Sequence, residues 1–349
     1  MRKVKFYKLL GVSKDIVNIN IGDYVQALAS SQFYPHIDGF IEREELDKYN
    51  GPKCKVIMNG WYMDNPKNWP PSSSIDPLFV AFHMNSMVKD QMLSSESISY
   101  LKKFEPIGCR DTNTMNMLKD KDVNAYFSGC MTLTLGYKFT SKNKDNKVYF
   151  VDPSFSKCWN LQNLLSSILY LLGNFNPIFT IARKYPGNES LLKKCLKLTT
   201  FYKEYSVFFS KEVLVNAEYI CQQSSYYSHN FPNNDKLLGE AKRLVEKYAK
   251  ARLVVTSRIH CALPCLGLET PVIFTELANQ SEASLCRFGG LRDLFNVMVW
   301  KNGKLQSDFN IGNKITEVSD VPLNKELWKP LAQALIVRCK DFFKDGNDL

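Results

Sequence analysis

No CxxC pair occurs among the ten cysteines of this sequence, and no low-complexity tract or short repeat interrupts its 349 residues. No run of Lys or Arg is interleaved with aromatic residues, which a surface for single-stranded nucleic acid requires. These absences exclude the dithiol redox pattern, repeat architectures and a nucleic-acid-binding tail. We therefore expect a globular protein without a nucleic-acid partner.

No apolar run is long enough to cross a bilayer. The N-terminal stretch Met1–Leu10 is basic, but Lys5 and Lys8 interrupt the apolar core that a signal peptide needs. The most apolar later stretch, Leu164–Leu172, is too short to span and contains two serines. The sequence thus predicts a soluble, cytoplasmic protein with at most peripheral membrane contact.

Most cysteines lie inside apolar segments, which is typical of reduced, buried thiols in the cytoplasm. His260, Cys261 and Cys265 would be the nearest approach to a metal site. At these spacings on a helix the three side chains do not share one face, so core packing explains them better. We expect no metal and no cofactor.

The charge balance favours an anionic partner. Lys and Arg number 45 against 35 Asp and Glu, which gives a net charge of +10 and a pI near 9.0. This charge is spread along the chain, so we expect a small or lipid-linked anion, such as a phosphorylated metabolite or an anionic glycolipid. With 45% hydrophobic residues, the chain has enough apolar material for two cores.

Short apolar strands, such as Val148–Val151, alternate with helical patterns, such as Asn234–Lys250, which predicts parallel sheets covered by helices. The polar stretch 140–147 is a candidate linker between two similar halves. We therefore predict an α/β fold with two Rossmann-like domains, 1–145 and 146–349, facing each other across a cleft. The second domain would end in a closing helix over 326–343.

The stretch from Ala251 to Phe274 reads as strand, tight turn, helix and strand. Leu253–Thr256 is the first strand, and Ser257 is the expected N-cap of the helix. Arg258 and His260 then lie at a helix N-terminus, where the backbone N–H groups and the helix dipole attract anions. In the alternative interpretation, Arg258 pairs with a surface carboxylate and His260 is a satisfied, half-buried histidine. That alternative is the commoner one for an isolated Arg-x-His.

Two positions in the first half, one before a helix and one after a strand, carry residues suited to ligand binding. Gly22-Asp23 is expected to be a loop that feeds a helix, with Asp23 as N-cap. Arg110 ends a short strand, and Asp111 caps the next helix. Because ligands bind at the carboxyl ends of parallel strands, we expect Arg110, Arg258 and His260 to converge on one cleft.

The loop Asn59–Pro71 contains two tryptophans and three prolines. Its aromatic rings could stack on sugars while amides and carboxylates bind hydroxyls, and long loops in compact domains tend to be functional. A packed structural loop is the equally good alternative.

Several motifs, in order, resemble the polysaccharide pyruvyl transferase family. They are Ile21-Gly-Asp-Tyr-Val-Gln-Ala-Leu28, Met58-Asn-Gly-Trp61, Pro106-Ile-Gly-Cys-Arg-Asp111, Phe127-Ser-Gly-Cys-Met-Thr-Leu-Thr134 and Thr256-Ser-Arg-Ile-His260. The resemblance implies a glycosyltransferase-B-like pair of Rossmann-type domains. It also implies transfer of pyruvate from phosphoenolpyruvate onto a sugar as a cyclic ketal, with release of phosphate, in the synthesis of polysaccharide such as exopolysaccharide or capsule. The acceptor would be a polysaccharide or a lipid-linked glycan.

The resemblance implies that Arg110, Arg258 and His260 handle phosphoenolpyruvate. Arginine forks bind carboxylate and phosphate in bidentate fashion, and a histidine can move protons near neutral pH. A lysine found downstream in some family members has no clear counterpart, and Arg287 and Arg292 are the nearest cations. Candidate substrate-binding residues are Gly22, Asp23, Asn59, Gly60, Trp61, Ser128, Gly129, Ser257, Ile259 and Arg287.

Two other functions remain open at this stage. A nucleotide-sugar-dependent glycosyltransferase would share the architecture and would want an acidic residue for the ribose, for which Glu276 and Glu282 are available. A non-catalytic glycan-binding protein would keep the aromatic loop, but it would not need the two arginines and the histidine to meet.

Overall fold

The computed structural model describes residues 6–11, 17–156, 164–278, 286–301, 304–310, 314–316 and 320–344. The strands are β1 (Phe6–Tyr7), β2 (Leu9–Gly11), β3 (Ile19–Asn20), β4 (Phe40–Glu42), β5 (Cys54–Tyr62), β6 (Ile75–Met84), β7 (Ile107–Cys109), β8 (Ala125–Phe127), β9 (Val148–Val151), β10 (Glu218–Ile220), β11 (Gln223–Ser224), β12 (Leu253–Thr256), β13 (Val272–Leu277), β14 (Asn296–Lys301) and β15 (Lys304–Ser307). The α-helices are α1 (Ile21–Ser31), α2 (Lys89–Met92), α3 (Ser95–Leu101), α4 (Thr112–Lys119), α5 (Gly136–Phe139), α6 (Leu164–Gly173), α7 (Phe175–Lys184), α8 (Leu191–Tyr205), α9 (Lys211–Asn216), α10 (Ser225–Asn230), α11 (Asn234–Lys250), α12 (Ile259–Gly267) and α14 (Trp328–Phe343).

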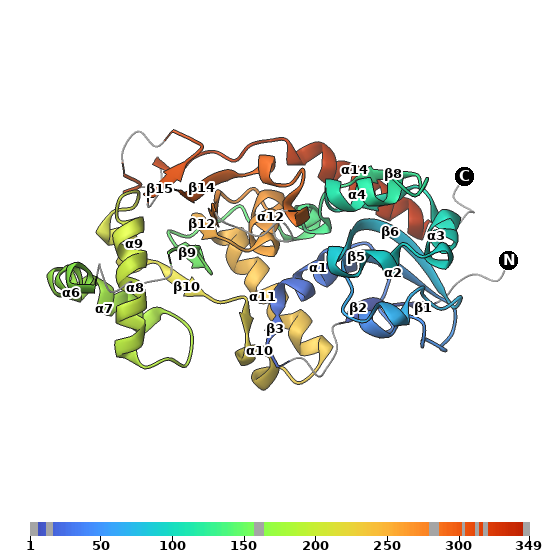
Figure 1. Cartoon of the computed structure of the whole chain (residues 1–349), viewed down its shortest axis with the longest axis horizontal. Coiled ribbons are helices and arrows are strands. Elements are labelled where there is room, and N and C mark those ends of the chain that lie inside the picture. The colour runs from blue at the N-terminus through green and yellow to red at the C-terminus, as the bar shows by residue number, and fades with distance from the viewer. Residues whose placement is uncertain are drawn as a thin grey trace.

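Two larger sheets organise the chain (Figure 1). The first has five strands in the order β1-β5-β6-β7-β8, and the second has six in the order β10-β9-β12-β13-β14-β15. Every pairing in them is parallel except that of β14 with β15. The predicted α/β class with parallel sheets and helices is therefore confirmed.

The strands of these sheets read as nearly continuous apolar runs because both sheet faces are covered. Val148–Val151 and Leu253–Thr256 fold as the predicted strands β9 and β12, and Asn234–Lys250 folds as the predicted helix α11. All four residues of β12 are buried. The carboxyl ends of β9 and β12 lie side by side, with Val151 in register with Thr256.

Three local predictions are wrong, and each error has a long-range cause. The expected N-cap of the first helix was Asp23, but Asn20 caps α1 by accepting from the N–H of Gly22. Asn20 is held there because β3 pairs with β11, far along the chain. Ser257 is not the cap of α12, because its hydroxyl donates to the carbonyl of Asp152 instead.

The third error concerns the start of the aromatic loop. Strand β5 continues through Asn59, Gly60 and Trp61, because β6 extends beside it and places Trp61 in register with His83. The register shifts between Met58 and Gly60, and Gly60 takes a φ of 107°, which favours glycine.

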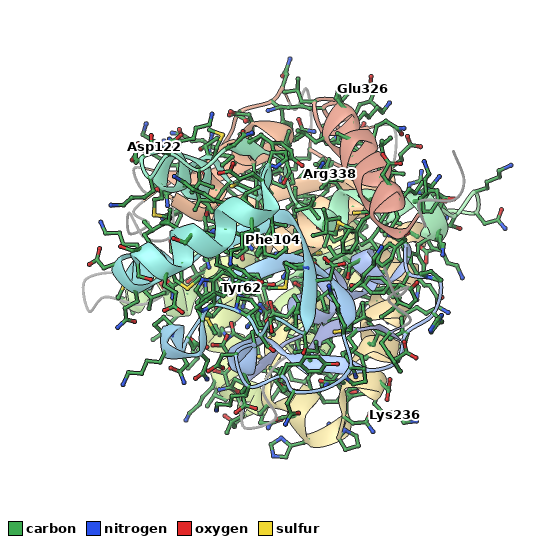
Figure 2. The ribbon with its side chains drawn as sticks, turned by 90° about the vertical axis from the view of Figure 1, so that its right-hand side faces the viewer. Tyr62, Phe104, Asp122, Lys236, Glu326 and Arg338 are labelled. Carbon is green, nitrogen blue, oxygen red and sulfur yellow. The ribbon has the colours of Figure 1, made fainter. Side chains whose placement is uncertain are left out.

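Helix α14 returns to the first sheet after the chain has completed the second (Figures 1 and 2). The backbone carbonyl of Phe342 accepts from Lys55 Nζ at 2.6 Å, and Arg338 donates to the carbonyl of Pro106. Its buried residues, among them Trp328 and Leu335, belong to a core cluster that also contains residues of α1, α11 and α12. The end of the chain thus closes the packing around its beginning.

Helix α8, which packs in a core with strands of the second sheet, carries a buried acid without an ion-pair partner among the described residues. Glu204 of α8 is 4% exposed, and its carboxylate accepts from the N–H of Ser156 at 3.1 Å. Burial raises the pKa of Glu204 to about 7 from an ordinary 4.5. The folded protein therefore holds this proton more tightly than the unfolded chain does.

We expect Glu204→Gln to stabilise the protein at high pH only. The pKa of Glu204 is raised by folding, so the wild-type free energy of unfolding falls as the pH rises from 4.5 to about 7 and is level above that. Glutamine keeps an acceptor for Ser156 without a charge. Urea unfolding should give the variant a free energy of unfolding up to about 3 kcal/mol higher than that of the wild type near pH 8. This difference should disappear near pH 4.5. A gap that does not depend on pH would contradict this account.

Candidate functional site

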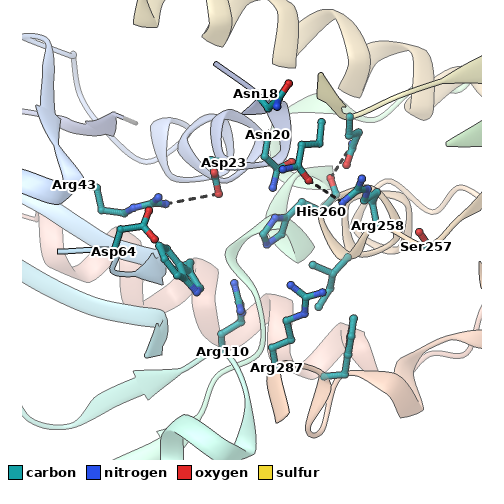
Figure 3. A pocket seen from close by; sticks show the side chains of 15 residues that line it. Asn18, Asn20, Asp23, Arg43, Asp64, Arg110, Ser257, Arg258, His260 and Arg287 are labelled. Carbon is teal, nitrogen blue, oxygen red and sulfur yellow. Dashed lines mark hydrogen bonds and ion pairs between the residues drawn. The ribbon is translucent and has the colours of Figure 1, made fainter. Parts of the chain in front are cut away.

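A cavity of about 380 Å³ opens where the two halves meet. It is lined by the start of α1, the ends of β5 and β7, and the turn between β12 and α12. The lining residues are Asn18, Asn20, Asp23, Arg43, Trp61, Asp64, Arg110, Gln222, Gln223, Ser257, Arg258, Ile259, His260, Arg287 and Phe288 (Figure 3). The expected convergence of Arg110, Arg258 and His260 is therefore present in the structure.

Pro264 shapes the start of α12. A proline inside a helix has no N–H to donate to the residue four positions earlier, and its ring presses on that carbonyl. Here that residue is His260, which has non-helical angles (φ −84°, ψ 18°). The carbonyl of His260 instead accepts from the side-chain amide of Gln222 at 3.4 Å. Pro264 thus gives His260 its own backbone geometry at the cavity wall.

The ring of His260 is buried, with 7% of the residue exposed. Nδ1 lies 3.4 Å from Nε2 of Gln26, which also donates to Asp23 at 3.2 Å. Since this amide can only donate, Nδ1 accepts and the neutral ring carries its proton on Nε2. Nε2 is buried and has no hydrogen-bond partner among the described residues. This N–H group is thus a buried donor that an acceptor atom of a ligand could satisfy.

Burial and the positive charges of Arg110 and Arg287 hold the pKa of His260 well below its usual value. The ring is therefore neutral near pH 7 while no anion is bound. A bound anion would oppose these effects and raise the pKa, because it favours the charged imidazolium.

Arg110 is the most deeply placed cation of the cavity, with 2% of the residue exposed. Its backbone N–H donates to the carbonyl of Phe82, which fixes it at the end of β7. Its buried Nε has no partner, and no carboxylate lies within ion-pair distance of its side chain in the described part of the chain. Burial lowers the pKa of Arg110, but a guanidinium stays charged in proteins. This charge is therefore buried without an ion-pair partner.

Arg258 is held differently. Its Nε donates to Asp152 at 2.8 Å, and one terminal nitrogen lies 3.4 Å from Gln223. Its side chain is 35% exposed. The Nε donor of the guanidinium is thus used by Asp152, and only the terminal nitrogens of Arg258 can bind a ligand. This pairing with a carboxylate is what the alternative interpretation of Arg258 predicted. Arg287 also lines the cavity and is exposed.

The opposite wall has acidic and aromatic groups (Figure 3). Asp23 lies 3.7 Å from Arg43, whose guanidinium stands 5.3 Å from the centre of the Trp61 ring. Burial raises the pKa of Asp23, although Arg43 and Arg110 oppose that effect. Asp64 completes this wall. The cavity therefore has a cationic side and a side suited to a polyhydroxylated ligand.

The other predicted site residues lie near the cavity or outside it. Gly22 packs against His260, while Asn59 and Gly60 line a small separate cavity beside Asp23 and Arg43. Ser128 links strands instead, accepting from the N–H of Ala81 and donating to the carbonyl of Cys109.

Gly129 has a φ of 70° and packs against Leu331 and Leu133, so it serves the turn and not the cavity. The second tryptophan of the predicted aromatic loop, Trp69, is a core residue whose N–H donates to Ser97. Arg292 is paired with Glu276 at 2.7 Å, and Glu282 lies outside the described residues.

Sequence reasoning missed the buried pair of His83 and Asp111 behind Arg110. Nδ1 of His83 lies 2.5 Å from Asp111, which also caps α4 through the N–H of Thr114. Burial and Arg110 lower the pKa of His83 to about 4, so the neutral ring donates to the carboxylate. Burial alone would raise the pKa of Asp111, but the bond from His83 and the charge of Arg110 leave it below its usual value.

Arg43 and the asparagines before α1 were missed as well. No local pattern marks them, because the pairing of β3 with β11 and the position of β4 bring them to the cavity. Asp64 is the carboxylate of the predicted aromatic loop, and it lines the cavity. Among the residues that the structure describes, no group of three or more His, Cys, Asp or Glu could hold a metal ion. No described helix is long and apolar enough to cross a membrane alone.

Comparison with known proteins identifies the family. A family model described as polysaccharide pyruvyl transferase matches residues 20–277, which include both arginines and the histidine. The chain belongs to the polysaccharide pyruvyl transferase family. A search of curated proteins gives no match. A solved structure titled as a functional uncharacterized protein, KP1_0663 from Klebsiella pneumoniae subsp. pneumoniae NTUH-K2044, is 11% identical with a TM-score of 0.42, over 84% of this chain and 93% of that one.

In this pyruvyl transferase family member, Gly22 packs tightly against the histidine. A Cβ added to Gly22 would lie 2.9 Å from Cβ of His260 and 3.2 Å from its Nδ1. Since real Cβ atoms are not found so close, the histidine or α1 would have to shift. The glycine of the first motif is thus explained by its contact with the histidine of the last.

We expect Gly22→Ala to displace His260, lower the melting temperature and reduce ligand binding in the cavity. Gly239→Ala is the matched control, because Gly239 lies within α11 with nothing within 4 Å of an added Cβ. It should stabilise the protein by about 0.5–1 kcal/mol, since alanine is the better helix former. Thermal melts of the two variants test this. A Gly22→Ala protein as stable as the wild type would refute the tight packing.

Proposed function

We propose that this protein transfers pyruvate from phosphoenolpyruvate to a pair of hydroxyls on a sugar, forming a cyclic ketal and releasing phosphate. The observation that carries the proposal is the pair of unmatched buried donors, Arg110 Nε and His260 Nε2, in a single cavity. Leaving such donors without acceptors costs about 1–3 kcal/mol each, and more for a charged group. An anion carrying several acceptor oxygens would satisfy both.

Phosphoenolpyruvate fits this demand because it carries a phosphate and a carboxylate on one small skeleton. We assign its more buried anionic group to Arg110 and His260, and the other to the outer cations Arg258 and Arg287. The N–H groups of Ile259 and His260 can add to this site, since the first N–H groups of a helix have no partner within it. With Asp152 on Nε, Arg258 contributes its terminal nitrogens only.

We place the sugar on the opposite wall. The ring of Trp61 offers an apolar face for the sugar. We expect the cation–π contact with Arg43 to hold that ring in position. Asp23 and Asp64 can accept hydrogen bonds from hydroxyls. The acceptor is a sugar of a polysaccharide or of a lipid-linked glycan, in line with the family name, and exopolysaccharide or capsule synthesis is the expected setting.

The reaction needs one proton delivered and two removed. Protonation of the methylene carbon of phosphoenolpyruvate gives a methyl group and positive character at C2. One sugar hydroxyl attacks C2 and loses its proton, the bond from C2 to the phosphate oxygen breaks, and the second hydroxyl closes the ring with loss of its own proton. The phosphate leaves with one of these protons, so the atoms and charges balance.

We assign the proton delivery to His260. A bound dianion raises the pKa of the ring and favours the imidazolium, whose Nε2–H faces the substrate. The second proton of the imidazolium, on Nδ1, then needs an acceptor. The side-chain oxygen of Gln26 is buried without a partner and can serve if the amide turns over. Asp23 lines the cavity and is the candidate base for the sugar hydroxyl, whereas Asp111 is engaged with His83.

The finer architecture belongs to the same proposal. We take the two sheets as the centres of two Rossmann-like domains in a glycosyltransferase-B-like arrangement, divided near residues 140–147. The donor would then bind mainly to the second domain and the acceptor mainly to the first. No cofactor is required for the steps above, and the reaction would take place in the cytoplasm, where phosphorylated donors are made.

The alternative functions have less support. For a nucleotide-sugar transferase, Glu276 was a candidate acid for the ribose, but it is paired with Arg292 and does not line the cavity. A glycan-binding protein without catalytic activity would gain nothing from a buried, unpaired Arg110, which costs stability. Ketal transfer explains both walls of the cavity.

Arg110→Met should separate binding from stability. Removing a buried charge that has no ion-pair partner should leave the ligand-free protein as stable as the wild type or more stable. The same change should weaken phosphoenolpyruvate binding by about 2–5 kcal/mol. Calorimetry and thermal melts of one sample measure both quantities.

The matched control for Arg110→Met is Arg292→Met. Arg292 has the same charge but is paired with the buried carboxylate of Glu276 outside the cavity. Its loss should lower the melting temperature and leave phosphoenolpyruvate affinity unchanged. Normal affinity in Arg110→Met would remove this arginine from the donor site.

His260→Gln tests the proton transfer. Glutamine can replace a hydrogen bond but cannot deliver a proton, so phosphoenolpyruvate should still bind while turnover falls by about 10²–10⁴-fold. Phosphate release in the presence of candidate galactosides or lipid-linked sugars measures turnover. The control is His36→Gln, at a histidine with a 57% exposed side chain outside the cavity. Full turnover by well-folded His260→Gln would exclude the histidine from the chemistry.

A further inference from the structure

Helix α6 presents an apolar stripe to solvent. Leu165, Ile168, Leu169 and Leu172 stand at positions i, i+3, i+4 and i+7 and are 71%, 38%, 61% and 66% exposed. Leu171, at 8% exposed, points inward. On an ordinary surface helix the stripe at this spacing faces the core and the polar face is outside. In α6 the apolar stripe is the outer face, which marks a surface for binding.

The stripe continues around a sharp bend. Helices α6 and α7 meet at 87°, and Phe175, the first residue of α7, is 47% exposed. Figure 1 shows α6 and α7 at one end of the longest axis of the molecule, opposite the end that holds α14. The corner they form therefore projects, and a flat partner could reach it without meeting the rest of the chain.

The surroundings of this corner are basic. From α6 to the end of α8, residues 164–205 contain six Lys or Arg and two Glu, a net charge of +4. Glu204 is buried, which leaves Glu189 as the exposed acid of this stretch. Lys203 Nζ lies 5.9 Å from the centre of the Tyr170 ring on α6, so the positive charge reaches the apolar helix itself. Apolar and cationic groups together are typical of helices that lie in a membrane interface.

We propose that the α6–α7 corner docks onto the surface of an anionic lipid bilayer. The apolar stripe would enter the boundary between headgroups and acyl chains, and the lysines and arginines of α7 and α8 would lie against the lipid phosphates. Helix α6, with ten residues, is about 15 Å long, about half of what a bilayer core requires, so it lies in the surface and does not span.

Charge decides between this partner and a second copy of the chain. A symmetric dimer through the corner would bring two like-charged basic surfaces together, which is unfavourable. An anionic bilayer supplies both an apolar layer and negative charge. The proposal does not depend on the reaction assigned to the cavity.

The test uses the full chain and vesicles of phosphatidylcholine, either pure or with roughly a third phosphatidylglycerol. We expect sedimentation with the anionic vesicles, much weaker binding to the neutral ones, and release as the salt concentration rises. Leu169→Asp with Leu172→Asp should reduce the partition coefficient by at least about tenfold, because two exposed leucines no longer bury. A second pair, Leu165→Asp with Ile168→Asp, should do the same.

Met87→Asp is the matched control, because Met87 is an equally exposed apolar residue, 81% exposed, on the first half of the chain. It should bind anionic vesicles like the wild type. Lys203→Glu should weaken binding to anionic vesicles and leave binding to neutral ones unchanged. The proposal is overturned if the chain does not bind anionic vesicles, or if both aspartate pairs bind as the wild type does. It is also overturned if light scattering finds dimers that the aspartate pairs dissociate.

Discussion

The structure depends on one helix that must pack on all sides. Nine of the eleven residues of α1 are buried, and the helix lies against α11 and α12 of the second half while it contacts β5 of the first. A helix so enclosed can present polar groups only at its end. Asp23 lies in the first turn and lines the cavity, Gln26 in the second turn contacts Nδ1 of His260, and Gly22 permits His260 to approach. The packing of α1 therefore sets where the site can be.

Electrostatic cost and function are linked in this site. The fold buries Arg110 without an ion-pair partner and keeps His260 neutral beside it, so the cavity is prepared for a negative charge that the chain does not supply. Asp111 lies next to Arg110, but the bond from His83 and the capping of α4 engage its oxygens elsewhere. The pair of His83 and Asp111 thus keeps a carboxylate close to the arginine without neutralising it directly.

Much of the fold was predictable because it follows from local patterns. The apolar runs of β9 and β12 and the amphipathic pattern of α11 carry their own signal, so their bounds were predicted residue by residue. The arginine after β7 and the Arg-x-His at the start of α12 were predicted to converge because both follow parallel strands. The caps were not predictable: Ser257 bonds to Asp152 across two neighbouring strands, and Asn20 is placed by β11. Arg43 reaches the cavity through tertiary contacts that leave no trace in the local sequence.

The return of α14 to the first sheet has a consequence for synthesis on the ribosome. The first five-stranded sheet is made by residue 127, but α14, whose residues pack into the core around α1, emerges some two hundred residues later. Until then, part of the apolar surface of the nascent first half has no cover, and α1 waits for its neighbours α11 and α12 until residues 234–267 have been made. Domains usually mature in order as they emerge, but in this chain the first half can complete its core only when the last helix has left the tunnel. The order of assembly therefore runs against the order of translation.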